Sequence, residues 1–192
     1  VGSEMCIRDS LTTLDRGQWA ELRTYLNEID SVTLQSISLI ETALAVIVMD
    51  QNEYADDSEM FKSMLCGDSN NRWYDKSLQF IVNAHHIAVN YEHSGVDGTT
   101  LGNLVRFLYQ NMKAGENKEI KQSVCQSDEL IFTLDDVIKL KISEAKLSSD
   151  QTYDDLAVEV LSFTDFGKER IKSLQISPDS FIQMGIQLAQ YK

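Results

Sequence analysis

The chain has 192 residues, of which 43% are hydrophobic and 24% charged, with nine Gly and one Pro. This composition is typical of a globular protein with a sizeable core, and it excludes a collagenous, low-complexity or disordered chain. The 30 Asp and Glu against 17 Lys and Arg give a formal net charge of −13, which disfavours general binding to nucleic acid or an anionic membrane. No apolar run reaches the roughly 20 residues that a membrane span needs.

Hydrophobic spacing predicts interleaved helices and strands along the chain. The predicted helices cover 18–27, 31–42, 99–112, 134–147 and 181–192. The predicted strands cover 44–49, 78–82, 87–91 and 156–163, and the second and third form a hairpin. Polar loops are expected over 50–71 and 113–129, and a basic turn over 166–173. The fold class that follows is α/β or mixed α+β, with layered packing.

The sequence at both ends of the chain predicts that it is a fragment of a longer protein. Residues 1–9 resemble the translated sequence of a sequencing adapter, so they are expected to be a non-native tail. Ser177 is the predicted N-cap of the last helix, with Pro178 at its first position. That helix is apolar on two faces, which is typical of a helix buried between other elements.

The residues best suited to catalysis follow the third predicted strand. The segment 91–98 reads Y-E-H-S-G-V-D-G, with His93 four residues before Asp97 and with Gly95 and Gly98 expected to permit a tight turn into the next helix. Histidine is the side chain best suited to accept a proton near neutral pH, so His93 is the candidate general base. Asp97 either pairs with His93 or faces away and holds an Arg that shapes the site.

Other reactive residue types give weaker signals. The three cysteines, Cys6, Cys66 and Cys125, are widely spaced, which predicts reduced thiols in an intracellular protein. None lies beside a base, and Ser94 has no nucleophile-elbow sequence around it, so no covalent nucleophile is predicted. His85 and His86 are expected to be surface residues, and no metal site is predicted.

The densest basic cluster of this acidic chain is Lys168, Arg170 and Lys172. It leads into the predicted N-terminus of the last helix, and both features attract anions. The cluster is therefore a candidate phosphate site or a solvated basic turn. The P-loop pattern G-x-x-x-x-G-K-[ST] is absent from the sequence around Gly167.

Three separated segments together resemble the choline/carnitine O-acyltransferase family. The segment 71–76, N-R-W-Y-D-K, is similar to a family signature that precedes the catalytic hairpin. The segment 92–98 matches the family pattern E-H-S-x-x-D-G. The segment from F-G-K at 166–168 through S-P-D at 177–179 to residue 192 matches a third family pattern. Residues 14–19 and 40–44 are also similar in sequence to the family, so the resemblance runs in order over about residues 10–192.

The resemblance implies reversible acyl transfer between coenzyme A and carnitine, without a covalent acyl-enzyme. His93 would be the general base. Lys168 and Lys172 would bind the 3′-phosphate of coenzyme A, and Asp179 would contact its adenine-ribose end. Asp97 would support the alcohol site by pairing with an Arg of the family. Coenzyme A is a substrate, and no tightly bound cofactor is implied.

The resemblance also implies two similar domains of the chloramphenicol acetyltransferase type. Residues 10–130 would belong to the first domain, and 131–192 would begin the second with its coenzyme A-binding segment. The alcohol-site Arg and the oxyanion Ser of the family lie beyond residue 192, so the fragment itself is expected to be inactive. The parent enzyme would be a monomer in the mitochondrion, peroxisome or cytoplasm.

Three alternatives to a carnitine enzyme stay open from the sequence. The first is a choline O-acetyltransferase of the same family. The second is another acyltransferase with an H-x-x-x-D-G motif, such as a lipoyl-type transacylase, although the matches at 71–76 and 177–192 argue against it. The third is a truncated, catalytically silent coenzyme A-binding fragment.

Overall fold

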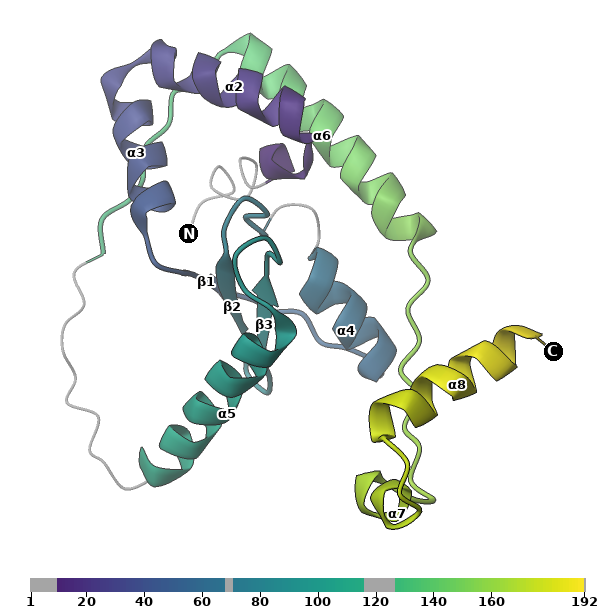
Figure 1. Cartoon of the computed structure of the whole chain (residues 1–192). Helices are drawn as coiled ribbons and strands as arrows, with labels where there is room; N and C mark the ends of the chain where they lie inside the picture. The colour runs from purple at the N-terminus through teal and green to yellow at the C-terminus, as the bar shows by residue number, and fades with distance from the viewer. Residues whose placement is uncertain (1–9, 68–70, 116–126, 192) are drawn as a thin grey trace. The chain divides into compact units, whose positions relative to one another are not determined.

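A computed structural model describes residues 10–67, 71–115 and 127–191 (Figure 1). The chain divides into two compact units, with the boundary between Val158 and Glu159. Within the described residues, no helix combines the length and the apolar character needed to cross a membrane.

Helices of the first unit begin at aspartates that act as N-caps. Asp15 precedes α2 (Arg16–Ile29) and accepts hydrogen bonds from the amides of Gly17 and Gln18. Asp30 separates α2 from α3 (Ser31–Thr42) and accepts from the Thr33 amide at 2.7 Å. Asp135 begins α6 (Asp136–Asp155) in the same way. An N-cap carboxylate satisfies amides that have no partner inside the helix, which explains these boundaries.

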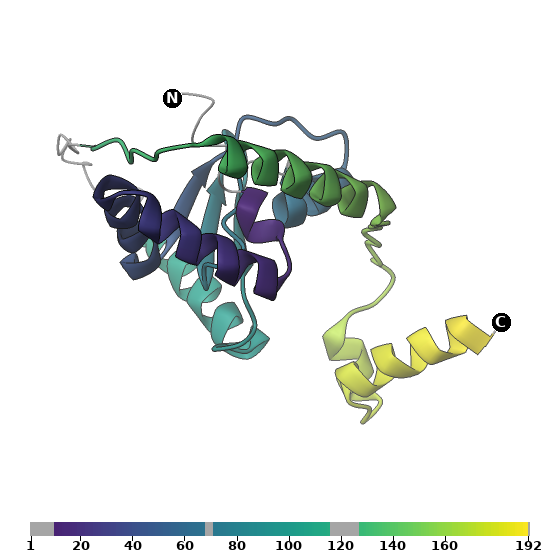
Figure 2. The same ribbon diagram turned by 90° about the horizontal axis from the view of Figure 1, so that it is seen from above.

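The described residues form two cores, and the larger lies among these helices and the short 3-10 helix η1 (Ser10–Thr13). α6 packs against η1, and its buried side chains share this core with those of α2 (Figures 1 and 2). The rings of Trp19 and Trp73 meet edge to face, with centroids 6.1 Å apart. The buried side chains of this core are Leu11, Trp19, Leu22, Leu26, Ile37, Trp73, Ile138, Ile142 and Ala145.

The second core covers one face of a three-stranded sheet in the order β1 (Val46–Met49), β2 (Leu78–Val82), β3 (Ile87–Tyr91). β1 and β2 are parallel, and α4 (Asp57–Cys66) lies between them in the sequence. β2 and β3 form an antiparallel hairpin, with Leu78 opposite Tyr91. The fully buried Ile81 packs with Val48 and Met64.

The segment 71–76 connects the sheet to the helical core. The Arg72 side chain is fully buried and makes an ion pair with Asp50 at 3.1 Å. It also donates to the carbonyls of Ser63 and Met64, so its fork-shaped guanidinium joins the end of β1 to α4. Its neighbour Trp73 points the other way, into the helical core.

Other residues of the same segment are fixed by hydrogen bonds. Asp75 accepts from the Trp19 indole at 2.8 Å. The Lys76 ammonium donates to the carbonyls of Ile40 and Glu41, near the end of α3. Long-range bonds of this kind satisfy buried polar groups. They give the sequence N-R-W-Y-D-K a structural role.

Several predicted elements are confirmed and others are wrong. The three strands β1–β3, both N-terminal helices, α5 (Gly98–Gly115) and α6 occur where the spacing placed them. The loop predicted over 50–71 is wrong because it contains α4. The strand predicted over 156–163 is also wrong, since these residues pair with no strand in the described part of the chain. Most of the predicted loop 113–129 lies outside the described residues.

The second unit contains α7 (Lys168–Ser173) and α8 (Pro178–Tyr191). The region predicted as a basic turn is therefore largely helical. α8 begins after Ser177 as predicted, but its side chains are exposed, so the expected burial is not seen within the described residues. Phe166 makes ring contacts with Phe163 and Phe181, and Ile171 is the buried residue of α7. The domain boundary near residue 131 stays a prediction.

Candidate active site

The loop between β3 and α5 carries the candidate base. Pairing of Tyr91 with Leu78 ends the hairpin, and the Glu92 amide then donates to the Ser77 carbonyl at 3.3 Å. Residues 92–97 leave the sheet, and α5 starts at Gly98. His93 lies one residue beyond this last anchoring bond, and its side chain is exposed. A strand end thus holds the backbone while the imidazole stays accessible to a ligand.

A carboxylate folds the chain tightly around His93. Oε2 of Glu92 accepts from the Ser94 amide at 3.0 Å and also from the Ser94 hydroxyl. These hydrogen bonds lower the pKa of Glu92, the hydroxyl bond contributing most, because both stabilise the charged carboxylate. The Glu92–Ser94 turn therefore has an ionised Glu92 at neutral pH.

The imidazole of His93 lies beside the Tyr91 ring. The two ring centroids are 5.8 Å apart, and the ring planes are tilted by 38°. Contacts at this separation have the geometry of weak aromatic pairs. Tyr91 and the Glu92–Ser94 turn are thus two close neighbours of the imidazole among the described residues.

Asp97 acts at the start of α5. Its Oδ1 accepts from the Thr100 amide at 2.8 Å, and this backbone bond is the largest cause of the lowered pKa of Asp97. The carboxylate therefore stabilises the N-terminus of the helix that follows the loop. This arrangement does not test the expected pairing with an Arg, which stays a prediction.

The two glycines of the loop differ from their expected role. Among the described glycines, Gly67 alone has a positive φ, so Gly95 and Gly98 adopt backbone conformations open to other residues. A Cβ at Gly95 would meet no atom within 4 Å. A Cβ at Gly98 would lie 3.7 Å from the Tyr91 hydroxyl, which is an ordinary contact. The turn at His93 is made by the Glu92 carboxylate and needs no glycine conformation.

The candidate coenzyme A residues lie in the second unit. Lys168 is the first residue of α7, and Lys172 follows one helical turn later. Residues at i and i+4 share one face of a helix, so the helix brings the two exposed ammonium groups together. Asp179 is in the first turn of α8 and is also exposed. The first unit holds His93 and Asp97.

The remaining candidates within the described part of the chain behave as ordinary surface or structural residues. His85 and His86 are exposed in the β2–β3 turn, where their amides donate to the side chain of Asn83. Burial raises the pKa of the Cys66 thiol, which makes it less reactive. Cys6 and Cys125 lie outside the described residues. Across 10–67, 71–115 and 127–191, no three His, Cys, Asp or Glu side chains are grouped to hold a metal ion.

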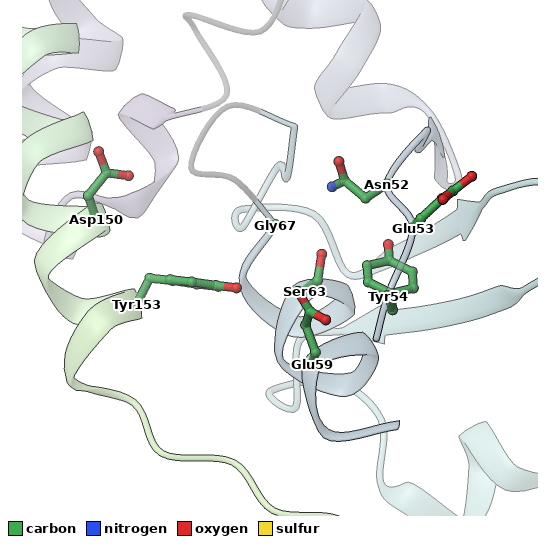
Figure 3. Close-up of a pocket in the computed structure, with 8 residues that line it drawn as sticks. All are labelled: Asn52, Glu53, Tyr54, Glu59, Ser63, Gly67, Asp150 and Tyr153. Carbon is green, nitrogen blue, oxygen red and sulfur yellow. The ribbon is translucent and has the colours of Figure 1, made fainter. Parts of the chain in front are cut away.

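A separate pocket of about 350 Å³ lies in the first unit between α4, the loop after β1 and the end of α6 (Figure 3). Glu53, Glu59 and Asp150 make its lining acidic. Tyr54 and Tyr153 also line it, and Figure 3 shows the Tyr153 hydroxyl pointing toward α4. The residues around this pocket include none of the predicted site residues.

The structural roles of Tyr91, Glu92 and Ser94 beside His93 were not predicted from the sequence. Each is a direct neighbour of the loop histidine, and an acid two residues before a Ser is a pattern that closes local turns. That signal is weak without coordinates, because the same pattern occurs in many loops.

The chain is similar to known proteins over nearly its whole length. Residues 9–192 match the sequence profile described as choline/carnitine O-acyltransferase. A peroxisomal carnitine O-octanoyltransferase of Bos taurus is 31% identical over 95% of this chain and 31% of its own length. A carnitine O-acetyltransferase of Columba livia is 33% identical over the same shares. The mitochondrial carnitine O-palmitoyltransferase 2 of Macaca fascicularis is 32% identical over 93% of this chain and 28% of its own length.

The chain therefore spans less than a third of the length of these relatives. The matched profile nevertheless includes both the His93 loop and the basic segment of the second unit. On this evidence the chain belongs to the choline/carnitine O-acyltransferase family.

Proposed function

We propose that the complete gene product carrying this sequence transfers an acyl group between coenzyme A and carnitine, with His93 as general base. The observation that carries the proposal is the exposed His93 held at a strand end within E-H-S-G-V-D-G. Family membership supports acyl transfer, and the names of the octanoyl, acetyl and palmitoyl relatives favour carnitine as the alcohol.

The proposed reaction passes directly between the two substrates. The His93 imidazole accepts the proton of the carnitine hydroxyl while that oxygen attacks the thioester carbonyl carbon. The new C–O bond forms and the C–S bond breaks, and the imidazolium returns its proton to the coenzyme A sulfur. In the reverse direction His93 takes the thiol proton. No protein nucleophile is required at any step.

Coenzyme A would be held by the second unit. Lys168 and Lys172 present two ammonium groups on one face of α7, which suits the dianionic 3′-phosphate. Asp179 would contact the adenine-ribose end from the first turn of α8. These local charges would attract the anion despite the formal net charge of −13.

The finer structural expectations belong to the same proposal. Asp97 would order the alcohol site through an Arg while its carboxylate caps α5. The complete protein would have two chloramphenicol acetyltransferase-like domains, and the mixed α/β elements of this chain agree with that architecture. Peroxisomal and mitochondrial relatives leave the compartment open between those two and the cytoplasm.

The test is an assay of free thiol release by the complete gene product. Acetyl-, octanoyl- and palmitoyl-coenzyme A are each offered with L-carnitine or with choline. We expect thiol release with carnitine. The His93→Ala substitution removes the general base and should lower kcat by about 10²- to 10⁴-fold. His85→Ala is the matched control, because it removes an exposed histidine from the other end of the same strand pair.

The outcomes separate the candidate functions. Release with choline alone would assign a choline acyltransferase. No release from a folded protein that binds coenzyme A would leave a silent binding module. A His93→Ala enzyme that keeps the unmodified rate would refute the role of His93.

A binding measurement tests the coenzyme A residues separately. Calorimetry should show that Lys168→Ala weakens coenzyme A binding about 10-fold, the loss expected for one charge-assisted contact of roughly 1.4 kcal/mol. Binding of 3′-dephospho-coenzyme A should change little. Lys146→Ala, at an exposed lysine in α6, is the control. An equal loss for both ligands would contradict the assignment of Lys168 to the 3′-phosphate.

A further inference from the structure

We propose that Glu92 is a positioning residue for His93. It acts by accepting hydrogen bonds from Ser94, the residue on the other side of the histidine. The inference rests on the proposed role of His93 as the base. It adds a residue whose side chain need not touch either substrate. Its function would be to fix the direction from which the imidazole approaches the alcohol.

The first support is the geometry of the Glu92–Ser94 turn. One carboxylate oxygen, Oε2 of Glu92, accepts both the amide and the hydroxyl of Ser94. His93 is the single residue between the two partners. These hydrogen bonds therefore close a tight turn with His93 at its centre, and they restrict the backbone on both sides of the His93 Cα. The lowered pKa of Glu92 keeps its carboxylate ionised, which is the form that accepts both bonds.

The second support is the contrast between the two sides of His93. On the N-terminal side, Tyr91 pairs with Leu78, and the Glu92 amide bonds to the Ser77 carbonyl. On the C-terminal side, residues 93–97 are exposed, and the space beside Gly95 is open. The bonds from Ser94 to Glu92 therefore tie the exposed side of the loop to the sheet.

The third support is the ring contact on the strand side. The Tyr91 ring lies 5.8 Å from the imidazole, between centroids. This contact orients the imidazole only while the His93 backbone keeps its place. A base displaced by about 1 Å can lose on the order of 10²-fold in rate, so a small release of this turn is expected to matter.

The site predicts a separation between activity and stability. Glu92 and Ser94 are exposed and belong to neither core, so removing their bonds should leave the folded units intact. In the complete gene product, Glu92→Ala should lower kcat at least about 10-fold and leave KM within about 2-fold. Glu92→Gln should recover kcat to within about 3-fold of the unmodified enzyme, because an amide oxygen accepts the same bonds.

Two further variants complete the experiment. Ser94→Ala removes one of the two donors and should lower kcat about 3-fold, a smaller loss than for the variant that removes both bonds. Glu59→Ala is the matched control, since Glu59 is an exposed carboxylate that accepts a local amide, that of Ala55 at 2.6 Å. Its kcat should stay within about 2-fold. Urea denaturation of each variant verifies that the protein is folded.

A direct measurement follows the turn without activity. In the 192-residue chain, the NMR shift of the Ser94 amide should titrate with the Glu92 carboxylate, at a pH below the usual range of glutamate. Glu92→Gln should abolish that titration. A Ser94 amide that is insensitive to acid in the unmodified chain would overturn the proposed geometry.

The kinetic outcomes distinguish the inference from the function it rests on. Full kcat in Glu92→Ala, with His93→Ala inactive, would overturn the positioning role alone. A raised KM at unchanged kcat would assign Glu92 to substrate binding and overturn it as well. Equal losses in Glu92→Ala and Glu92→Gln would assign the effect to charge, contrary to the proposal. Full activity in His93→Ala would refute the proposed function and this inference together.

Discussion

Replacing Arg72 with Met tests how much the buried Arg72–Asp50 ion pair stabilises the first unit. The Arg72 and Asp50 side chains are 0% and 1% exposed, and their charged atoms are 3.1 Å apart. The guanidinium also donates to the carbonyls of Ser63 and Met64 and to the Asn71 side chain. Met fills a similar volume, but it would leave Asp50 buried without its cation and these acceptors without a donor.

The expected loss follows from that burial. Removing one partner of a buried ion pair costs about 3–5 kcal/mol, because the remaining charge stays desolvated. A domain of ordinary stability has about 5–15 kcal/mol in total, so Arg72→Met removes a large part of it. Arg72→Lys keeps the charge but loses the planar fork, and we expect a loss of about 2 kcal/mol.

The assay is urea unfolding of the 192-residue chain at pH 7, followed by tryptophan fluorescence. Both tryptophans of the chain, Trp19 and Trp73, are buried in the first unit, so the signal reports on that unit. Lys141→Met is the control. It breaks the Lys141–Glu144 pair on α6, whose side chains are 44% and 50% exposed, and should cost less than about 0.5 kcal/mol.

The reasoning is refuted by a small effect. If Arg72→Met lowers the free energy of unfolding by less than about 1 kcal/mol, the buried pair contributes no more than a surface pair. If Arg72→Met does not fold, Arg72→Lys carries the test. A midpoint for Arg72→Lys equal to that of Lys141→Met would contradict the proposed importance of the fork geometry.

Three further predictions concern stability. Ile81→Ala, at a fully buried position of β2, should cost about 2–5 kcal/mol in urea unfolding, and a loss under 1 kcal/mol would show that the sheet core repacks. Leu161→Ser, in the second unit at a side chain 88% exposed, should change the free energy of unfolding by less than about 0.5 kcal/mol when unfolding is followed by far-ultraviolet circular dichroism, and a larger loss would contradict its exposure. The bonds from Tyr25 and from the Ile138 amide lower the pKa of Asp135, so its stabilisation is present at neutral pH and is lost as the pH falls through that lowered pKa. The urea midpoint of Asp135→Ala should therefore lie below that of the unmodified chain at pH 7 and approach it near pH 2; a difference that persists in acid would contradict this linkage.

The sequence predicted the elements whose local signals agree with their tertiary contacts. β2 and β3 are short apolar runs joined by a polar turn, and Asn83 closes that turn through the amides of His85 and His86. The helices α2 and α6 carry both an apolar stripe and an aspartate N-cap. Where a period and a cap point to the same element, the prediction is reliable.

The errors have physical reasons. α4 is acidic and only partly apolar, yet Asp56 caps it and Glu59 bonds back to the Ala55 amide, a start signal that composition concealed. The apolar run 156–163 favours a strand, but a strand exists only with a partner, and the described residues supply none. The complete burial of Arg72 was not predictable, since burial of a charge depends on partners distant in the sequence.

The position of the candidate base in the fold was predictable, whereas the local geometry around it was not. The motif around His93 and its place after a strand could be derived from the sequence, and the loop is found there. Neither Gly95 nor Gly98 has the positive φ that glycine readily adopts, so the turn into α5 does not use their conformational freedom. The Glu92 side chain closes a different turn, at His93. Side-chain bonds of this kind depend on coordinates, since a short polar residue has several local partners available.

The opposite directions of Arg72 and Trp73 affect how the first unit unfolds. Trp73 belongs to the helical core, while Arg72 is bonded to groups that surround the sheet core. Opening the helical core would expose Trp73, which directly follows Arg72. Opening the sheet core would break the bonds of Arg72, which directly precedes Trp73. We therefore expect the amides of β2 and those of α6 to exchange with deuterium at similar opening free energies, as one cooperative unit. The β2–β3 hairpin, which directly precedes the loop of the candidate base, would then owe part of its rigidity to the helical core.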